Sequence, residues 1–234
     1  MRVLLTNDDG IDARGLQTLR RALLEVPGIE LAVIAPDSNR SATARSITIR
    51  RPLWVEEIDF GDGTVGYATD GTPVDCVRFA TLGLIEGFQA ELIVSGINHG
   101  ANLGDDITYS GTVAAAFTAR IVEEIEEVPL PSGTLLNINV PPGKPRAVEV
   151  ARLGKRVYRD ELSLMQEESG RRLYRVYGPV PHHTDEPGTD LHAVGEGNIA
   201  VTPLHFDLTD EPGIDTLRAY DLARLLAPAA EEVE

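Results

Sequence analysis

Short runs of apolar residues alternate with amphipathic stretches over the first 140 residues of the chain. The runs are bounded by polar or glycine-containing segments, as buried strands are. They span 3–6, 31–35, 65–69, 92–95 and 135–140. Two stretches, 14–26 and 112–127, repeat apolar residues every three or four positions, which predicts helices. Thr72 followed by Pro73 predicts the start of another helix, running to about Glu86. Strands that alternate with helices predict an α/β fold: a three-layer, Rossmann-like, mostly parallel sheet.

Two shorter strands, Ile47–Arg50 and Trp54–Glu57, are predicted around Pro52, still within the first 140 residues. The chain after residue 142 has strand-like segments but little helical period. Later segments with the same character are 148–153, 173–177 and 199–203, and an amphipathic helix is predicted over 215–226. We therefore predict an α/β core over 1–142, a β-rich arm or oligomerisation extension over 143–212, and a C-terminal helix with an acidic tail over 213–234.

Charge and composition narrow the functional classes. The formal net charge of −16 disfavours binding to nucleic acid polymers and to anionic membranes. No apolar run approaches the ~20 residues of a membrane-spanning helix, and the start of the chain lacks a signal-peptide pattern. Cys76 is the single cysteine, so no internal disulfide can form. These features favour a cytoplasmic protein with a small-molecule substrate.

Two adjacent carboxylates, Asp8 and Asp9, directly follow the first predicted strand. Ligands of open α/β sheets bind at the carboxyl ends of the strands. Neighbouring carboxylates repel each other unless a cation lies between them, and hard divalent cations prefer oxygen ligands. The alternative interpretation is a polar turn, because Asp-Gly pairs are common in turns.

Three further polar segments are candidates for the same edge of the sheet. Residues 95–106 place glycines, amides and carboxylates after a buried strand, which favours a functional loop over an irregular connection. Residues 109–116 begin a helix of small residues, which indicates either a phosphate site or a well-capped helix. Residues 37–41 follow the second strand and could equally be a capped turn. Gly61–Gly66 fits a dinucleotide-binding pattern but lies between two strands, which favours a hairpin turn.

At this point the chain resembles a known family, the stationary-phase survival protein SurE family of metal-dependent nucleoside monophosphate phosphatases. The matching segments occur in the family's order and cover most of the chain: LLTNDDGIDARGLQTL, APDSNRSA, GTPVDCV, SGINHGANLGDDITYSGTVAAA, LNINVP and AVTPLHFDLT.

The resemblance implies one divalent metal ion per subunit, Mg²⁺ or Mn²⁺, held by Asp8, Asp9, Ser41 and Asn98. It implies hydrolysis of nucleoside monophosphates at the 5′ position, and possible 3′ activity. A non-catalytic nucleotide sensor and a short-chain polyphosphate hydrolase are the alternatives. It also implies a homodimer or a dimer of dimers, because residues 143–212 form exchanged arms in that family.

The remaining site predictions concern phosphate binding and proton transfer. Phosphate oxygens are expected at a helix N-terminus and a nearby amide, formed by Asn102, Ser110, Gly111 and Thr112. Asp8 and Asp9 are predicted to take part in catalysis. Asp106 and His205 are candidates for proton transfer, the alternatives being a loop acid and a strand-end histidine.

The chain departs from the family pattern at one junction. After SGTVAAA the family turns back into another strand and a second helix, whereas here Ala116 runs directly into Phe117. We predict one fused helix over 112–127 and one parallel strand fewer than in the family, the alternative being a gap in the chain between Ala116 and Phe117.

Overall fold

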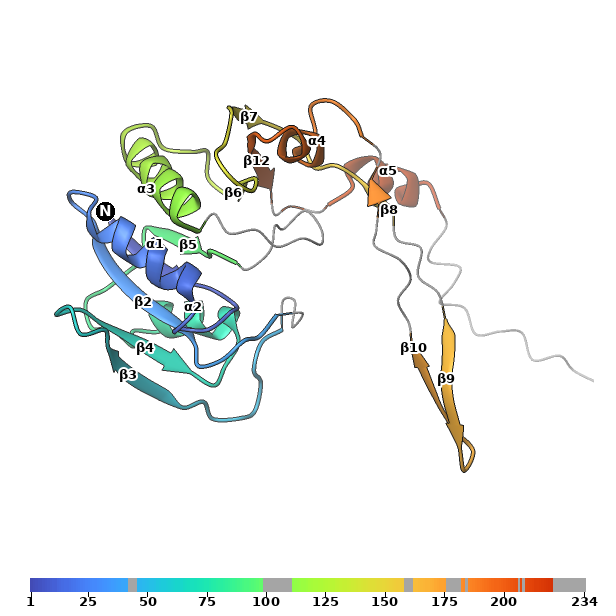
Figure 1. Ribbon diagram of the computed structural model, residues 1–234, viewed down its shortest axis with the longest axis horizontal. Coiled ribbons are helices and arrows are strands. Elements are labelled where there is room, and N and C mark those ends of the chain that lie inside the picture. Colours follow the sequence, from blue (N-terminus) through green and yellow to red (C-terminus); the bar gives the residue numbers. More distant parts are fainter. Residues whose placement is uncertain are drawn as a thin grey trace, which may run out of the picture.

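The computed structural model describes most of the chain (Figure 1). The described residues are 1–41, 46–98, 111–157, 162–175, 182–183, 185–205, 207 and 209–220. Of these, no helix is long and apolar enough to cross a membrane.

A five-stranded sheet forms the centre of the first part of the chain (Figure 1). Its order is β3-β4-β2-β1-β5, and every pair is parallel except β3 with β4. The strands are β1 (Arg2–Thr6), β2 (Glu30–Pro36), β3 (Val55–Asp59), β4 (Val65–Thr69) and β5 (Leu92–Ser95). The apolar runs therefore marked the buried strands, and the α/β class is confirmed.

Helices cover both faces of this sheet, which gives the predicted three layers. On one face, α1 (Arg14–Leu24) packs against α3 (Gly111–Glu127), and both contribute to a core with β1 and β2. On the other face, α2 (Pro73–Thr81) packs against β1 and β2 through Cys76 and Ala80.

The α2 helix has the predicted start but an earlier end. Thr72 accepts a hydrogen bond from the backbone N–H of Asp75, and the Asp75 carboxylate accepts one from Thr72, so a complete capping box begins the helix. The predicted end at Glu86 is wrong. Leu82 is the C-cap and Gly83 has a φ of 88°, a left-handed conformation that stops the helix after Thr81.

The segment Ile47–Arg50, predicted as a strand, forms none. The Thr48 N–H donates to both oxygens of the Asp75 carboxylate, and Arg50 has a φ of 70°. The backbone therefore bonds to the capping carboxylate of α2 instead of a neighbouring strand. The hairpin prediction is confirmed, because β3 and β4 pair antiparallel across the Gly61–Gly63 turn.

Arg20, a buried residue of α1, binds the β3–β4 hairpin to that helix. The Arg20 side chain donates to Asp62 Oδ2 at 2.6 Å and to Thr64 Oγ1 at 2.5 Å, and its guanidinium lies 4.2 Å from the Phe60 ring centroid. The hydrogen bonds that the Asp62 carboxylate accepts from Arg20 and from the Thr64 hydroxyl hold its pKa well below the usual range. A buried cation is tolerated here because hydrogen bonds and a carboxylate compensate for its lost hydration.

The strand predicted over 135–140 does not join the main sheet. It forms β6 (Thr134–Asn139), which pairs antiparallel with β12 (Ile199–His205) in a separate three-stranded sheet completed by β7 (Val148–Val150). A short helix that the sequence analysis missed, α4 (Asp190–Gly195), packs on β12. The second sheet thus contains strands from both sides of residue 142, the predicted end of the core.

The fused helix is present. In α3 the helix continues without a break through Ala116 and Phe117 to Glu127. Ala115, Ala119 and Val122 are buried against α1, so one apolar stripe crosses the junction.

A hairpin in the predicted arm stands apart from both sheets in Figure 1. It consists of β9 (Ser163–Glu168) and β10 (Arg171–Arg175), and several of its apolar side chains are exposed: Leu164, Met165, Leu173 and Tyr174. The remaining elements are the short pair β8 (Arg156–Val157) and β11 (His182–His183), and helix α5 (Glu211–Arg218).

Candidate active site

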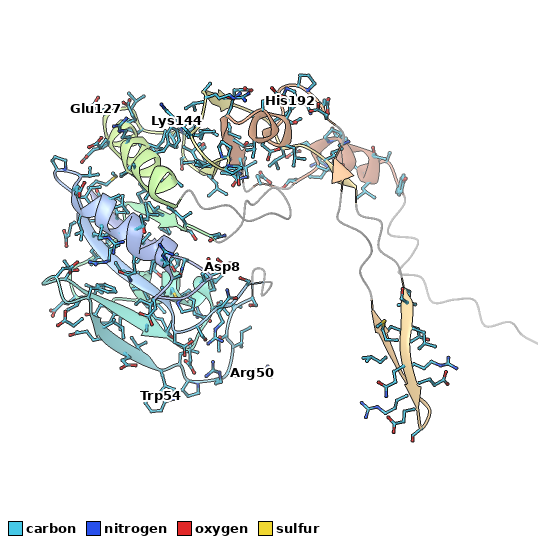
Figure 2. All side chains as sticks on the ribbon, in the orientation of Figure 1. Asp8, Arg50, Trp54, Glu127, Lys144 and His192 are labelled. Atoms are coloured by element: carbon cyan, nitrogen blue, oxygen red, sulfur yellow. The ribbon has the colours of Figure 1, made fainter. Side chains whose placement is uncertain are left out.

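Four parallel strands of the main sheet end at the same edge. The chain passes from β1 outward to β2 and β4, then returns to place β5 on the other side of β1. The strand order therefore reverses between β1 and β5, and such a switch point is where open α/β sheets bind ligands. Asp8 and Asp9 follow β1 and Asn98 follows β5, so these candidate residues flank the switch point. Figure 2 labels Asp8 at this edge.

The loop after β1 is held by a buried amide. The Asn7 side chain is completely buried, donates to the carbonyl of Gly10 at 3.0 Å and accepts from its N–H at 3.2 Å. Gly10 has a φ of 108°, and a Cβ there would lie 3.3 Å from the backbone of Ser38. Glycine thus allows the loops after β1 and β2 to approach closely.

Two effects raise the pKa of the Asp8 carboxyl group above its usual value. Burial is the larger of them, and the negative charge of Asp9 beside it is the second. Both effects disfavour two negative charges in this loop. A divalent cation would compensate for both, which is an argument from this structure for a cation at this position.

The loop after β2 contacts the loop after β1 through Asn39 and Arg40. The N–H of Arg40 donates to the carbonyl of Asp8 at 2.7 Å, and Asn39 Nδ2 donates to Asp9 Oδ1 at 3.0 Å. Ser41 is exposed, and its N–H donates to Asn39 Oδ1 at 2.8 Å.

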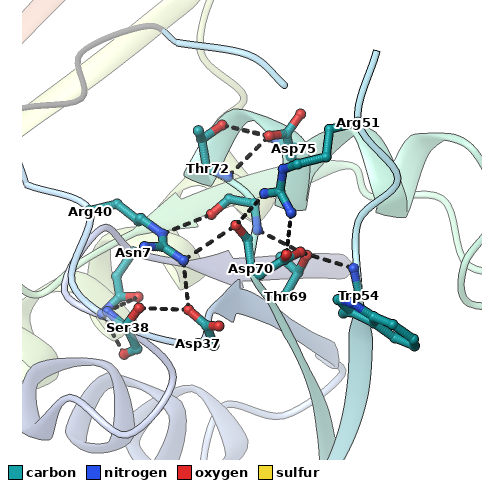
Figure 3. Close-up of polar contacts among 12 residues, drawn as sticks. Asn7, Asp37, Ser38, Arg40, Arg51, Trp54, Thr69, Asp70, Thr72 and Asp75 are labelled. Carbon is teal, nitrogen blue, oxygen red and sulfur yellow. Dashed lines mark hydrogen bonds and ion pairs between the residues drawn. The ribbon is translucent and has the colours of Figure 1, made fainter. Parts of the chain in front are cut away.

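Arg40 also ties this loop to the one after β4 (Figure 3). Its guanidinium donates to the carbonyls of Gly71 and Asp70, at 3.2 and 3.3 Å, and to the Asp37 carboxylate at 2.8 Å. The Asp70 carboxylate accepts from Arg51 and from the N–H of Trp54, and the Arg51 hydrogen bond lowers the pKa of Asp70. These contacts connect the three loops that follow β1, β2 and β4.

The loop after β5 lies against the start of α1. The N–H of Gly96 donates to the carbonyl of Thr6 at 3.0 Å. A Cβ on Gly15 would lie only 1.9 Å from the carbonyl oxygen of Ile97, so the helix backbone closely contacts the residue before Asn98. Asn98 is half-buried.

Several predicted site residues lie outside the described part of the chain. Asn102, Asp106 and Ser110 are among them, and of Gly111 and Thr112 only the backbone is described, as the first residues of α3. His205 ends β12 opposite Thr134, where its Nδ1 accepts from the N–H of Asp207 and its Nε2 faces Gly133. Its role in proton transfer stays a prediction.

The donor set suits a hard cation. Within the described ranges, no group of three or more His, Cys, Asp or Glu side chains gathers to hold a metal ion. The predicted set has two carboxylates, one hydroxyl and one amide oxygen. Oxygen-only ligands of this kind fit Mg²⁺ or Mn²⁺ better than Zn²⁺, which favours nitrogen and sulfur.

Three residues that shape this edge are not among the individually predicted site residues. Asn7 closes the first loop, Gly15 permits the contact with Ile97, and Asn39 connects Asp9 with Ser41. Asn39 lies in the polar segment 37–41 and is of a residue type common in turns, but its contact with Asp9 on another loop leaves no local signal in the sequence.

The topology places the chain among three-layer α/β proteins whose ligand site lies at a topological switch point of the sheet. Residues 3–126 match the family model of Survival protein SurE. A relative from Rubrobacter xylanophilus, named 5'-nucleotidase SurE, is 45% identical over 97% of this chain and 99% of its own length. A Vibrio cholerae protein of the same name is 37% identical over 94% of this chain and 96% of its own length. The crystal structure of SurE from Aquifex aeolicus superposes with a TM-score of 0.75 at 32% identity, covering 93% of this chain and 98% of that one. The chain belongs to the SurE family.

The alignments also bear on the shortened region. The alignment with the Rubrobacter protein extends over 265 residues, more than the 234 of this chain. The relative therefore has residues without a counterpart here, and their place at the Ala116–Phe117 junction stays a prediction.

Proposed function

We propose that this chain is a metal-dependent 5'-nucleotidase that hydrolyses nucleoside monophosphates to a nucleoside and phosphate. The observation that carries the proposal is the near full-length similarity to relatives named 5'-nucleotidase SurE. The loops of the switch point support it, because they supply Asp8, Asp9, Ser41 and Asn98 in the order of the resembling family.

These four residues would hold one divalent ion, Mg²⁺ or Mn²⁺. When bound, such an ion supplies Lewis-acid polarisation of a phosphate oxygen and orientation of the attacking group. The contribution of the chain itself is to position the ion. The hydrogen bond from Arg40 N–H to the Asp8 carbonyl and the amide of Asn39 keep the loops after β1 and β2 together.

The start of α3 supports phosphate binding in this proposal. The helix begins at Gly111, and the first N–H groups of a helix have no partners within it. Together with the helix dipole they favour phosphate oxygens. Ser110, Thr112 and Asn102 would add side-chain donors, and Asp106 and His205 remain candidates for proton transfer.

Phosphate release tests the proposed activity. Purified protein stripped with EDTA should release no phosphate from 5'-AMP, and added Mn²⁺ or Mg²⁺ should restore release. 3'-AMP, tested in parallel, reports which position is preferred. Absence of release from nucleoside monophosphates under every metal condition would contradict the proposal.

We further propose that the protein is a homodimer or a dimer of dimers. The β9–β10 hairpin exposes Leu164, Met165, Leu173 and Tyr174, and an isolated two-stranded hairpin is marginally stable in water. A second copy would cover these side chains. Light scattering should give at least twice the 25.3 kDa chain mass at micromolar concentration, and a monomeric mass would refute this assembly.

The cellular setting in this proposal is the cytoplasm. Cys76, the only cysteine, is a buried free thiol. Burial raises its pKa to about 12, which makes it unreactive as a thiolate at neutral pH. The net charge of −16 supports small-molecule substrates over nucleic acid polymers and membranes.

A further inference from the structure

One amide side chain connects two loops of the candidate site. Asn39 Nδ2 donates to Asp9 Oδ1 at 3.0 Å, and Asn39 Oδ1 accepts from the N–H of Ser41 at 2.8 Å. Asp9 follows β1 and Ser41 follows β2. Asn39 thus contacts two of the four proposed metal ligands, one on each loop.

The two partners determine how the amide is oriented. Ser41 offers a backbone donor, so the oxygen must face it, which is the geometry of an Asx turn. The carboxylate of Asp9 only accepts, so the NH₂ group must face it. Aspartate at position 39 would put a third carboxylate beside Asp9, and a residue without a polar side chain would make neither contact.

We propose that Asn39 is a positioning residue of the metal site, which sets the direction of the Asp9 carboxylate and the place of Ser41 on the next loop. The inference rests on the proposed function, because it requires these two residues as ligands. Partners that orient metal ligands typically change metal affinity or activity 10–100-fold when removed.

The surroundings of Asn39 indicate that its side chain contributes little to the stability of the fold, so its role in the metal site can be tested separately. The residue is exposed, so the loss of its hydrogen bonds should change the stability of the fold only slightly. Its backbone is held independently, since the next residue donates from Arg40 N–H to the Asp8 carbonyl at 2.7 Å. The loop should therefore keep its course when the side chain is truncated.

Direct titration with Mn²⁺ tests the inference, with calorimetry on the metal-free full chain. Asn39→Ala removes both contacts, and we expect its Mn²⁺ dissociation constant to rise 10–100-fold with an unchanged melting temperature. Asn39→Ser keeps an oxygen able to accept from Ser41 but is too short to reach Asp9, so a weakening of about tenfold or more should remain. Excess Mn²⁺ should restore phosphate release by both variants.

Ser38→Ala is the matched control. Ser38 is the exposed neighbour, and its hydroxyl donates to Asp37, so its removal should leave Mn²⁺ binding unchanged. Wild-type affinity in both Asn39 variants, while Asp9→Asn loses Mn²⁺, would overturn the role of Asn39 and leave the proposed function standing. Wild-type affinity in Asn39→Ser alone would show that only the turn matters and would also overturn it. Failure of the wild-type chain to bind Mn²⁺ would overturn both.

Discussion

Asp9→Asn should lower metal-dependent phosphate release by at least about 100-fold, the effect of losing several kcal/mol of charge stabilisation at a metal site. The substitution keeps the size of the side chain and removes one negative charge from the pair with Asp8. Removing that charge takes away a cause of the raised Asp8 pKa, so the fold should remain intact. The measurements are phosphate release from 5'-AMP, Mn²⁺ titration and thermal unfolding.

Asp12→Asn provides the matched comparison for this charge change. Asp12 is exposed a few residues further along the same loop, and its neutralisation should leave turnover near the wild-type level. If Asp9→Asn kept near-normal metal-dependent hydrolysis, the cation would lie elsewhere.

Gly15→Ala should impair the candidate metal site through the loop after β5, which carries Asn98. Alanine normally stabilises a helix relative to glycine by about 1 kcal/mol. Here the new Cβ would lie 1.9 Å from the Ile97 carbonyl oxygen and 2.9 Å from the carbonyl carbon, and both are backbone atoms. The loop after β5 must therefore shift, and we expect a net destabilisation of about 2 kcal/mol. A displacement of about 1 Å at Asn98 would reduce turnover about 100-fold.

Gly195→Ala is the control for that experiment. Gly195 is also a helical glycine, in α4, but a Cβ there meets no atom within 4 Å. It should be neutral or slightly stabilising in chemical denaturation, with normal turnover. Equal behaviour of the two variants would show that the contact between α1 and Ile97 is not tight.

The sequence predicted the buried strands because their apolar runs are an intrinsic property of a parallel sheet covered on both faces. It could not predict which sheet a strand joins. Residues 135–140 have the same apolar character as 92–95, yet they pair with β12, a segment some 60 residues further on. Pairing of this kind is decided by tertiary packing, which leaves no local signal.

Local errors had local physical causes. Ile47–Arg50 looked like a strand, but the Thr48 N–H bonds to Asp75, a residue committed to capping α2. The six residues of α4 are too few to show a helical period, although Thr189 at its N-cap was a usable signal. For the site, residue types after strand ends indicated where to look, while the bridging amide of Asn39 became visible only once two loops met.

All four proposed ligands are encoded before residue 99, and the main sheet is complete at Ser95. A chain emerging from the ribosome would therefore present the loops after β1, β2, β4 and β5 before any strand of the second sheet has been made. The face of the sheet that α1 covers lacks the rest of its cover until α3 follows, since Ala115, Ala119 and Val122 complete that core. N-terminal units generally fold first during synthesis, so folding of the nascent chain should begin in this half, with α3 as the element that closes it.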